Sequence, residues 1–168
     1  MRAANALMRD IPFRMQSLSY LRDLWIPGDV FPNVDLCQGY YHINVHPLDR
    51  KYIGFAWNGH FFRYRCLPFG IKTAPRYFTK VMNLLARKWR AAGIRVIVYL
   101  DDWLFLPRLS DVPSIRNTIL PSCRDAHVAI NYEKSHLVRS SALTFLGFTV
   151  DITRNKIVVN KDRWSSCL

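Results

Sequence analysis

The sequence lacks acidic residues over a long internal stretch. From Arg50 to Arg95 there are eleven Lys or Arg residues and no Asp or Glu, whereas the rest of the chain carries 13 basic and 12 acidic residues. This segment therefore supplies almost all of the net charge of +12. A concentrated positive field suits a polyanion, with nucleic acid as the first candidate and an anionic membrane surface or a solvated basic face as alternatives. Aromatic residues that can stack on bases interleave with these charges, namely Trp57, Phe61, Phe62, Tyr64, Tyr77 and Phe78.

Cysteine is sparse and dispersed. The four cysteines, at positions 37, 66, 123 and 167, form no C-x-x-C pair, which argues against a zinc site and against a dense disulfide framework. Reduced thiols in the cytoplasm or nucleus are the simplest interpretation.

Long apolar runs are also missing. No stretch approaches the roughly 20 residues of a membrane span, so we expect no membrane partner. The N-terminal residues 1–19 contain Arg2, Arg9 and Arg14 but no apolar core of a secretory signal. We therefore expect an intracellular protein, with a transit peptide as the alternative for an Arg-bearing and acid-poor N-terminus.

The pattern of helices and strands predicts one domain of the α+β class, with no internal repeat or linker. Helices are expected at 15–24, from the N-cap Thr73 to a stop at Gly93, and from Ser110 or Asp111 toward His127, the last kinked or split by Pro121. Short strands are expected at 33–36, 128–131, 145–151 and 156–159, with a turn at 132–135 between the second and third.

Asn58-Gly59 marks the clearest hairpin, between strands at 52–57 and 61–66. Its returning strand alternates Phe62, Tyr64 and Cys66 with Arg63 and Arg65, which predicts one packed face and one basic face. The helix that follows has an apolar face and a basic stripe, on which we expect Arg87 and Arg90 to be solvated.

Two adjacent carboxylates, Asp101 and Asp102, interrupt the apolar run Ile94–Leu106. Unpaired charges in such a place are costly, and two together repel. At the tip of a tight hairpin both could reach one bound cation, for which Mg²⁺ is the most plausible choice. An ordinary Asp-Asp turn is the alternative. A third carboxylate, Asp35, lies in a predicted strand, and three carboxylates on adjacent antiparallel strands would fit a two-metal site for phosphoryl transfer.

Five motifs in order resemble the palm of reverse transcriptases. They are Val34–Ile43, Leu67–Pro75, the Tyr-x-Asp-Asp motif Tyr99–Asp102, Asn131–Ser135 and Phe145–Phe148. The residues that flank these motifs resemble those of retrotransposon enzymes, including the DIRS type. The resemblance implies an α+β polymerase palm, an antiparallel sheet packed on helices, at about 30–44 and 67–160. Part of the fingers would form a hairpin at about 45–66.

The resemblance also implies roles for individual residues. Asp35, Asp101 and Asp102 would be catalytic and would hold two Mg²⁺ ions, or Mn²⁺ in their place, with the Leu36 carbonyl as a further ligand. Nucleotide-binding positions would be Gln38, Gly39, Tyr40 as the gate against a 2′-hydroxyl, Phe69, Gly70 and Lys72. Template or primer would meet Arg76, Tyr99, Phe145, Leu146 and Gly147, and Lys134 would lie near pyrophosphate. Some of these residues also have a structural explanation. Tyr40 and Phe145 could be ordinary core residues, and Lys72, Arg76 and Lys134 could be ordinary solvated surface residues.

The implied function is RNA-directed DNA polymerisation from dNTPs on a primed RNA or DNA template. Relative to the family, this chain is expected to lack the thumb and the first fingers strands, as a fragment of a retroelement would. An inactive palm remnant that binds nucleic acid is the alternative. A basic structural or membrane-surface module ranks last because it leaves the three aspartates unexplained.

Overall fold

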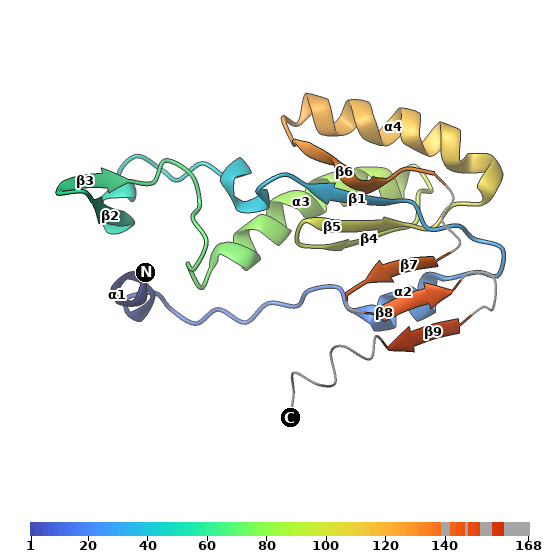
Figure 1. The fold of residues 1–168 in the computed structure, drawn as a ribbon, viewed down its shortest axis with the longest axis horizontal. Helices are drawn as coiled ribbons and strands as arrows, with labels where there is room; N and C mark the ends of the chain where they lie inside the picture. The colour runs from blue at the N-terminus through green and yellow to red at the C-terminus, as the bar shows by residue number, and fades with distance from the viewer. Residues whose placement is uncertain (139–141, 147, 152–155, 160–168) are drawn as a thin grey trace.

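A computed structural model describes residues 1–138, 142–146, 148–151 and 156–159 of the 168-residue chain. Its centre is a four-stranded antiparallel sheet in the order β4-β5-β1-β6, shown in Figure 1. The strands are β1 (Asn33–Leu36), β4 (Val96–Tyr99), β5 (Asp102–Phe105) and β6 (Ile130–His136). The expected antiparallel sheet is therefore present.

Both faces of this sheet are covered, because alternate residues of its strands enter two different cores. Val96 and Val98 of β4 pack with helices α3 (Ala74–Ala91) and α4 (Val112–Asp125), whereas Ile97 packs on the other side with α2 (Leu18–Leu24). Trp103 and Phe105 of β5 face the α3 and α4 side, and Leu104 faces the α2 side. The run at 94–106 is apolar because its strands are buried on two sides.

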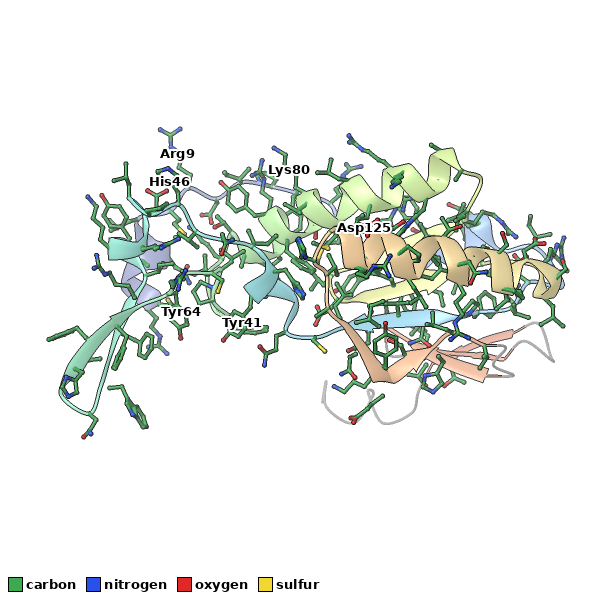
Figure 2. All side chains as sticks on the ribbon, turned by 90° about the horizontal axis from the view of Figure 1, so that it is seen from above. Arg9, Tyr41, His46, Tyr64, Lys80 and Asp125 are labelled. Atoms are coloured by element: carbon green, nitrogen blue, oxygen red, sulfur yellow. The ribbon has the colours of Figure 1, made fainter. Side chains whose placement is uncertain are left out.

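Helix α3 follows the sequence prediction closely. Thr73 occupies its N-cap, Pro75 lies in its first turn, and Gly93 follows it with a φ of +80°. Phe78, Met82 and Trp89 are buried in the core, and Lys80 points away from the sheet (Figure 2). Arg87 and Arg90 are exposed, as expected for the basic stripe, but the Arg90 guanidinium also donates to the carbonyl of Val96 (2.8 Å) and to Gln16 (3.0 Å), and partial burial lowers its pKa.

The hairpin β2 (Gly54–Trp57) and β3 (His60–Arg63) projects away from the body of the molecule (Figures 1 and 2). Asn58 and Gly59 form its turn with φ values of +47° and +75°, as expected for the favoured hairpin turn. The predicted packed and basic faces of the returning strand are confirmed in part: Tyr64 and Cys66 are half-buried and Arg63 and Arg65 are exposed. Phe62 departs from the prediction, because all residues of β2 and β3 are exposed. Phe55 stacks on Phe62 across the hairpin at 5.4 Å, so the aromatic residues pack on one another.

Three other elements differ from the sequence prediction. The first three residues of the expected helix 15–24 are not helical, since α2 begins at Leu18; a short α1 (Arg2–Ala6) precedes it in the chain. Pro121 lies inside a single helix α4 and does not split it. The expected turn at 132–135 belongs to β6, because pairing with β1 extends this strand to His136.

A second sheet joins β7 (Ala142–Phe145), β8 (Phe148–Asp151) and β9 (Lys156–Val159), all antiparallel. The closing hairpin of β8 and β9 agrees with the prediction, whereas β7 was not expected as a separate strand. Within the parts of the chain that the structure describes, no helix has the length and hydropathy needed to cross a bilayer.

A buried ion pair joins the segment before β1 to the start of β4. The fully buried carboxylate of Asp29 accepts two hydrogen bonds of 2.6 Å from the Arg95 guanidinium and one of 2.8 Å from the backbone N–H of Ile26. Arg95 also donates to the carbonyl of Leu24 (2.8 Å). A bidentate pair of this kind is directional and holds the two segments in one arrangement.

Replacing Asp29 by Ala should lower the free energy of unfolding by about 3–5 kcal/mol, because Arg95 would remain partly buried without its counter-charge. Urea denaturation monitored by circular dichroism measures this change. Asp125→Ala, which removes an exposed ion pair with Arg124 (3.6 Å), should cost less than about 1 kcal/mol. Equal losses in the two variants would contradict a structural role for the buried pair.

Candidate active site

The β4–β5 hairpin presents the two adjacent aspartates at its tip. Tyr99 pairs with Asp102, so Leu100 and Asp101 form the loop, and Leu100 takes a left-handed φ of +51°. The indole N–H of Trp103 donates to the carbonyl of Leu100 (3.0 Å) and supports this conformation. The tight hairpin predicted for this motif is therefore confirmed.

The third carboxylate lies directly opposite. In the β1–β5 register Asp35 faces Asp102, and its carboxyl group lies close enough to contribute to a raised pKa of Asp102. Two residues on the flanking strand hold Asp35 in place: its backbone N–H donates to the Ser135 hydroxyl (3.0 Å), and Asn131 is its partner in the β1–β6 register.

Asp101 approaches the pair from the loop. Its carbonyl accepts the backbone N–H of Leu36 (3.0 Å), which ties the hairpin tip to the end of β1. Its side chain lies against Gly39, where an added Cβ would stand 3.5 Å from both Cβ and Cγ of Asp101. The tighter neighbour of an added Cβ would be the ring of Phe78, at 3.1 Å, so the chain after β1 fits closely between this ring and Asp101.

The negative charges at this site repel one another. Burial, followed by the charges of Asp35 and Asp101, raises the pKa of Asp102 to about 6, and the Lys134 ammonium acts in the other direction. Asp102 nevertheless keeps part of its surface open to solvent. Burial and then the charge of Asp101 also raise the pKa of the Tyr40 hydroxyl.

Carboxylate oxygens are the ligands that Mg²⁺ prefers, so the donor set has the right chemistry for this ion. Burial contributes most to the raised pKa of Asp102, and the charges of Asp35 and Asp101 add to it; a bound cation would favour the ionised carboxylate. The three side chains do not form a preassembled metal site, however. Among residues 1–138 and the described strands beyond, no three acidic, His or Cys side chains form a metal-binding group.

Two of the predicted nucleotide-binding residues, Gly39 and Tyr40, lie beside Asp101. Gln38 adopts a left-handed conformation (φ +49°) and begins a 3₁₀ turn, Gly39–His42, whose first residue is buried. The Tyr40 ring packs on Phe69 at 5.0 Å and on Phe78 at 5.5 Å. Tyr40 and Phe69, which are far apart in sequence, therefore form one surface next to Asp101.

The loop after Phe69 is fastened to the N-terminal segment. The Asn5 side chain donates to the carbonyl of Gly70 (2.7 Å) and accepts the backbone N–H of Lys72 (3.0 Å). The Lys72 ammonium forms an ion pair with Asp10 (2.9 Å), so a contact with phosphate would require an exchange of partners. Arg76, in the first turn of α3, lies over the ring of Tyr77 at 5.3 Å.

Of the remaining predicted residues, one lies near the carboxylates and two lie in the core. Lys134 on β6 lies close enough to Asp102 to influence its pKa. Phe145, 3% exposed, and Tyr99 belong to the core on the α2 side, which satisfies the packing explanation for Phe145. Leu146 follows with a φ of +53°, and Gly147 lies outside the described residues.

Sequence reasoning missed three residues that position the site: Asn5, His42 and Ser135. Each acts through a hydrogen bond to a residue at least 65 positions away in sequence. His42 and Ser135 lie within the motifs, but no local pattern indicates a partner at such a distance.

Asp102→Asn should stabilise the metal-free protein at pH 7 by an amount of the order of 1 kcal/mol, after allowance for solvent screening. The folded-state pKa of Asp102 lies above its ordinary value of 3.8. The native protein therefore binds an extra proton between about pH 4 and pH 6, and its stability falls as the pH rises through this window. Urea denaturation in EDTA at pH 4 and 7 should show the gain only at pH 7, and Asp23→Asn, at an exposed site, should show none. A gain of the same size at both pH values would refute the mutual repulsion.

Sequence comparison identifies the family. Residues 13–150 match the family described as reverse transcriptase (RNA-dependent DNA polymerase). The chain is 28% identical over 138 residues to the genome polyprotein of Petunia vein clearing virus (isolate Shepherd), covering 82% of this chain and 6% of the polyprotein. It is 31% identical over 121 residues to the retrovirus-related Pol polyprotein from transposon gypsy of Drosophila melanogaster, covering 71% and 11%. With Protein P of duck hepatitis B virus (isolate brown Shanghai duck S5) it shares 25% identity over 153 residues, covering 88% and 19%. The chain thus spans only a small part of these curated relatives, and the DIRS subtype stays a prediction.

The fold agrees with solved structures. The foamy viral protease-reverse transcriptase in complex with an RNA/DNA hybrid superimposes with a TM-score of 0.81 at 23% identity, covering 98% of this chain and 22% of that one. Its complex with dsDNA gives a TM-score of 0.83 at 24% identity, covering 99% and 34%. Since the family match extends over residues 13–150 and the fold is shared, the chain belongs to the reverse transcriptase (RNA-dependent DNA polymerase) family.

Proposed function

We propose that this chain forms the palm and part of the fingers of an RNA-directed DNA polymerase, with the palm at about 30–44 and 67–160 and the fingers hairpin at about 45–66. The observation that supports it best is the placement of three carboxylates at one end of the central sheet: Asp35 lies opposite Asp102 in the β1–β5 register, and Asp101 lies in the adjoining hairpin loop. A structural role does not require three mutually repelling carboxylates at this place.

Reverse transcriptases use divalent metal ions. Asp35, Asp101 and Asp102 would hold two Mg²⁺ ions here, or Mn²⁺ in their place, together with the carbonyl of Leu36. When bound, these ions would lower the pKa of a primer 3′-hydroxyl and neutralise charge on the dNTP triphosphate. The protein's own part is to keep the carboxylates ionised and aligned, for which Ser135 holds the Asp35 backbone and Lys134 opposes the rise in the Asp102 pKa.

The surface formed by Tyr40 and Phe69 would receive the incoming dNTP. Tyr40 would lie under its sugar, where a 2′-hydroxyl would collide with the ring, and the backbone of Gln38 and Gly39 would offer N–H groups to the triphosphate. Gly70 and Lys72 would line the other side, with the Lys72 ammonium moving from Asp10 to a phosphate. Lys134 would lie on the pyrophosphate side.

The template and primer would follow the basic segment. Its exposed cations include Lys51, Arg63 and Arg65 beside the aromatic hairpin and Lys80 on α3, a combination that suits a nucleic-acid backbone and its bases. Arg76 and Tyr99 would lie near the paired template, and Phe145, Leu146 and Gly147 near the primer end. The same surface supports the second candidate, an inactive palm-fold remnant that binds nucleic acid.

Asp101→Asn and Asp102→Asn should each lower primer extension by at least about a hundredfold, the scale seen when a group acting on developing charge is lost. The assay uses an RNA template, a DNA primer, dNTPs and Mg²⁺, with Asp125→Asn on the exposed end of α4 as the matched control. Salt-sensitive binding of the primed template should survive in all three variants. Binding without extension in the parent protein would favour the inactive remnant, and extension that survives both substitutions would refute the site.

Tyr40→Val should increase the use of rNTPs relative to dNTPs, because a smaller side chain would leave room for the 2′-hydroxyl. Tyr40→Phe keeps the ring and should retain the preference for dNTPs. The ratio of kcat/KM values for dNTP and rNTP in the same primer-extension assay measures the change. An unchanged ratio in Tyr40→Val would leave Tyr40 as a core residue only.

A further inference from the structure

One imidazole connects the turn beside the carboxylates to the strand that carries Lys134. The backbone N–H of Ala129 donates to Nε2 of His42 (2.9 Å), and Nδ1 of His42 lies 2.8 Å from the carbonyl oxygen of Gly39. Ala129 is 87 positions from His42 in sequence and immediately precedes β6. His42 therefore links the first sequence motif to the residue directly before β6, the strand that carries the fourth motif.

The two contacts determine the protonation of this side chain. A backbone N–H can only donate, so Nε2 of His42 must be the acceptor and carries no proton. In a neutral imidazole the proton then lies on Nδ1, which donates it to the carbonyl of Gly39. Neither a protonated imidazole nor the other tautomer can make both bonds.

The groups that His42 holds bear directly on the site. Gly39 is confined between Phe78 and Asp101, where an added Cβ would lie 3.1 Å and 3.5 Å from them, respectively. The next residue, Tyr40, packs on Phe69. A shift of this turn would therefore move Tyr40 relative to Asp101.

The peptide of Ala129, at the other end of the hydrogen bond from His42, is also held by the fold. The carbonyl of Ala129 accepts the backbone N–H of Cys37 (2.9 Å), so its peptide is held from both sides by the chain after β1. The strand β6 follows, and it carries both Ser135, which holds Asp35, and Lys134, which acts on Asp102.

We propose that His42 is a positioning residue for nucleotide binding. As a neutral imidazole with its proton on Nδ1, it holds the Gly39–Tyr40 turn in register with β6, so that the Tyr40 surface and the carboxylates keep one relative position. This inference rests on the proposed polymerase function for its nucleotide, whereas the link itself is a property of the fold.

The test compares three substitutions. His42→Asn retains a donor near the position of Nδ1 but loses the acceptor for Ala129. His42→Gln places an amide oxygen near the position of Nε2 and can accept the Ala129 N–H again. His127→Asn is the matched control, since His127 is exposed and its φ of +53° is one that Asn adopts readily.

In primer extension with Mg²⁺, His42→Asn should raise the KM for dNTP by about three- to tenfold, the usual effect of one hydrogen bond, with kcat within about twofold of the parent. His42→Gln should recover part of this loss, and His127→Asn should match the parent. An unchanged KM in His42→Asn, or an equal fall of kcat in all variants together with a lower Tm, would overturn the positioning role.

A second measurement needs no catalysis. In uniformly ¹⁵N-labelled protein, NMR at pH 7.5 should show the His42 proton on Nδ1, and the Ala129 amide should exchange with solvent faster in His42→Asn than in the parent. The opposite tautomer would refute the link. A parent protein that shows this tautomer but extends no primer would contradict the proposed function, and with it the nucleotide role of His42, while leaving the link established.

Discussion

The antiparallel register of β1 and β5 is the constraint on which the site depends. It places Asp35 opposite Asp102 across two neighbouring strands, so that two like charges must share one end of the sheet. A slip of one residue would relieve the repulsion but would also turn Val34 and Leu36 out of the core. The apolar packing on both faces therefore maintains an electrostatic arrangement that is unfavourable by itself, in which burial and then the charges of Asp35 and Asp101 raise the pKa of Asp102.

Hydrogen bonds between residues far apart in sequence hold the segments around Asp35 and Asp102. Asn5 fastens the loop at 70–72 to the N-terminal segment, His42 fastens the turn at 39–40 to the start of β6, and Ser135 fastens Asp35 from the same strand. Each bond uses a small number of atoms and bridges distant parts of the chain. The positions of the carboxylates and of the Tyr40 surface thus depend on contacts outside the motifs themselves.

The basic segment serves two physical purposes. Lys72, Arg90 and Arg95 are bound to Asp10, to the Val96 carbonyl and to Asp29, where they hold the fold together. The other cations that stay exposed, including Lys51, Arg63, Arg65 and Lys80, are left to set the external field. The surface potential offered to a polyanion is therefore smaller than the net charge of the segment suggests, and it is weighted toward the hairpin and the exposed side of α3.

Local patterns in the sequence determined the short-range features: the tight Asp101-Asp102 hairpin, the Asn58-Gly59 turn, helix α3 between Thr73 and Gly93, and the identity of the carboxylates. Turn preferences and helix caps act over a few residues and can be recognised without the fold. Only the tertiary structure decided that 132–135 continues a strand, that Arg90 is hydrogen-bonded to Val96, and that strands β2 and β3 of the aromatic hairpin stay exposed. It also decided that Asn5, His42 and Ser135 hold the site. These outcomes depend on which distant segments pair, and the pairing follows from burial of the whole sheet between two cores, a property that no short stretch of sequence contains.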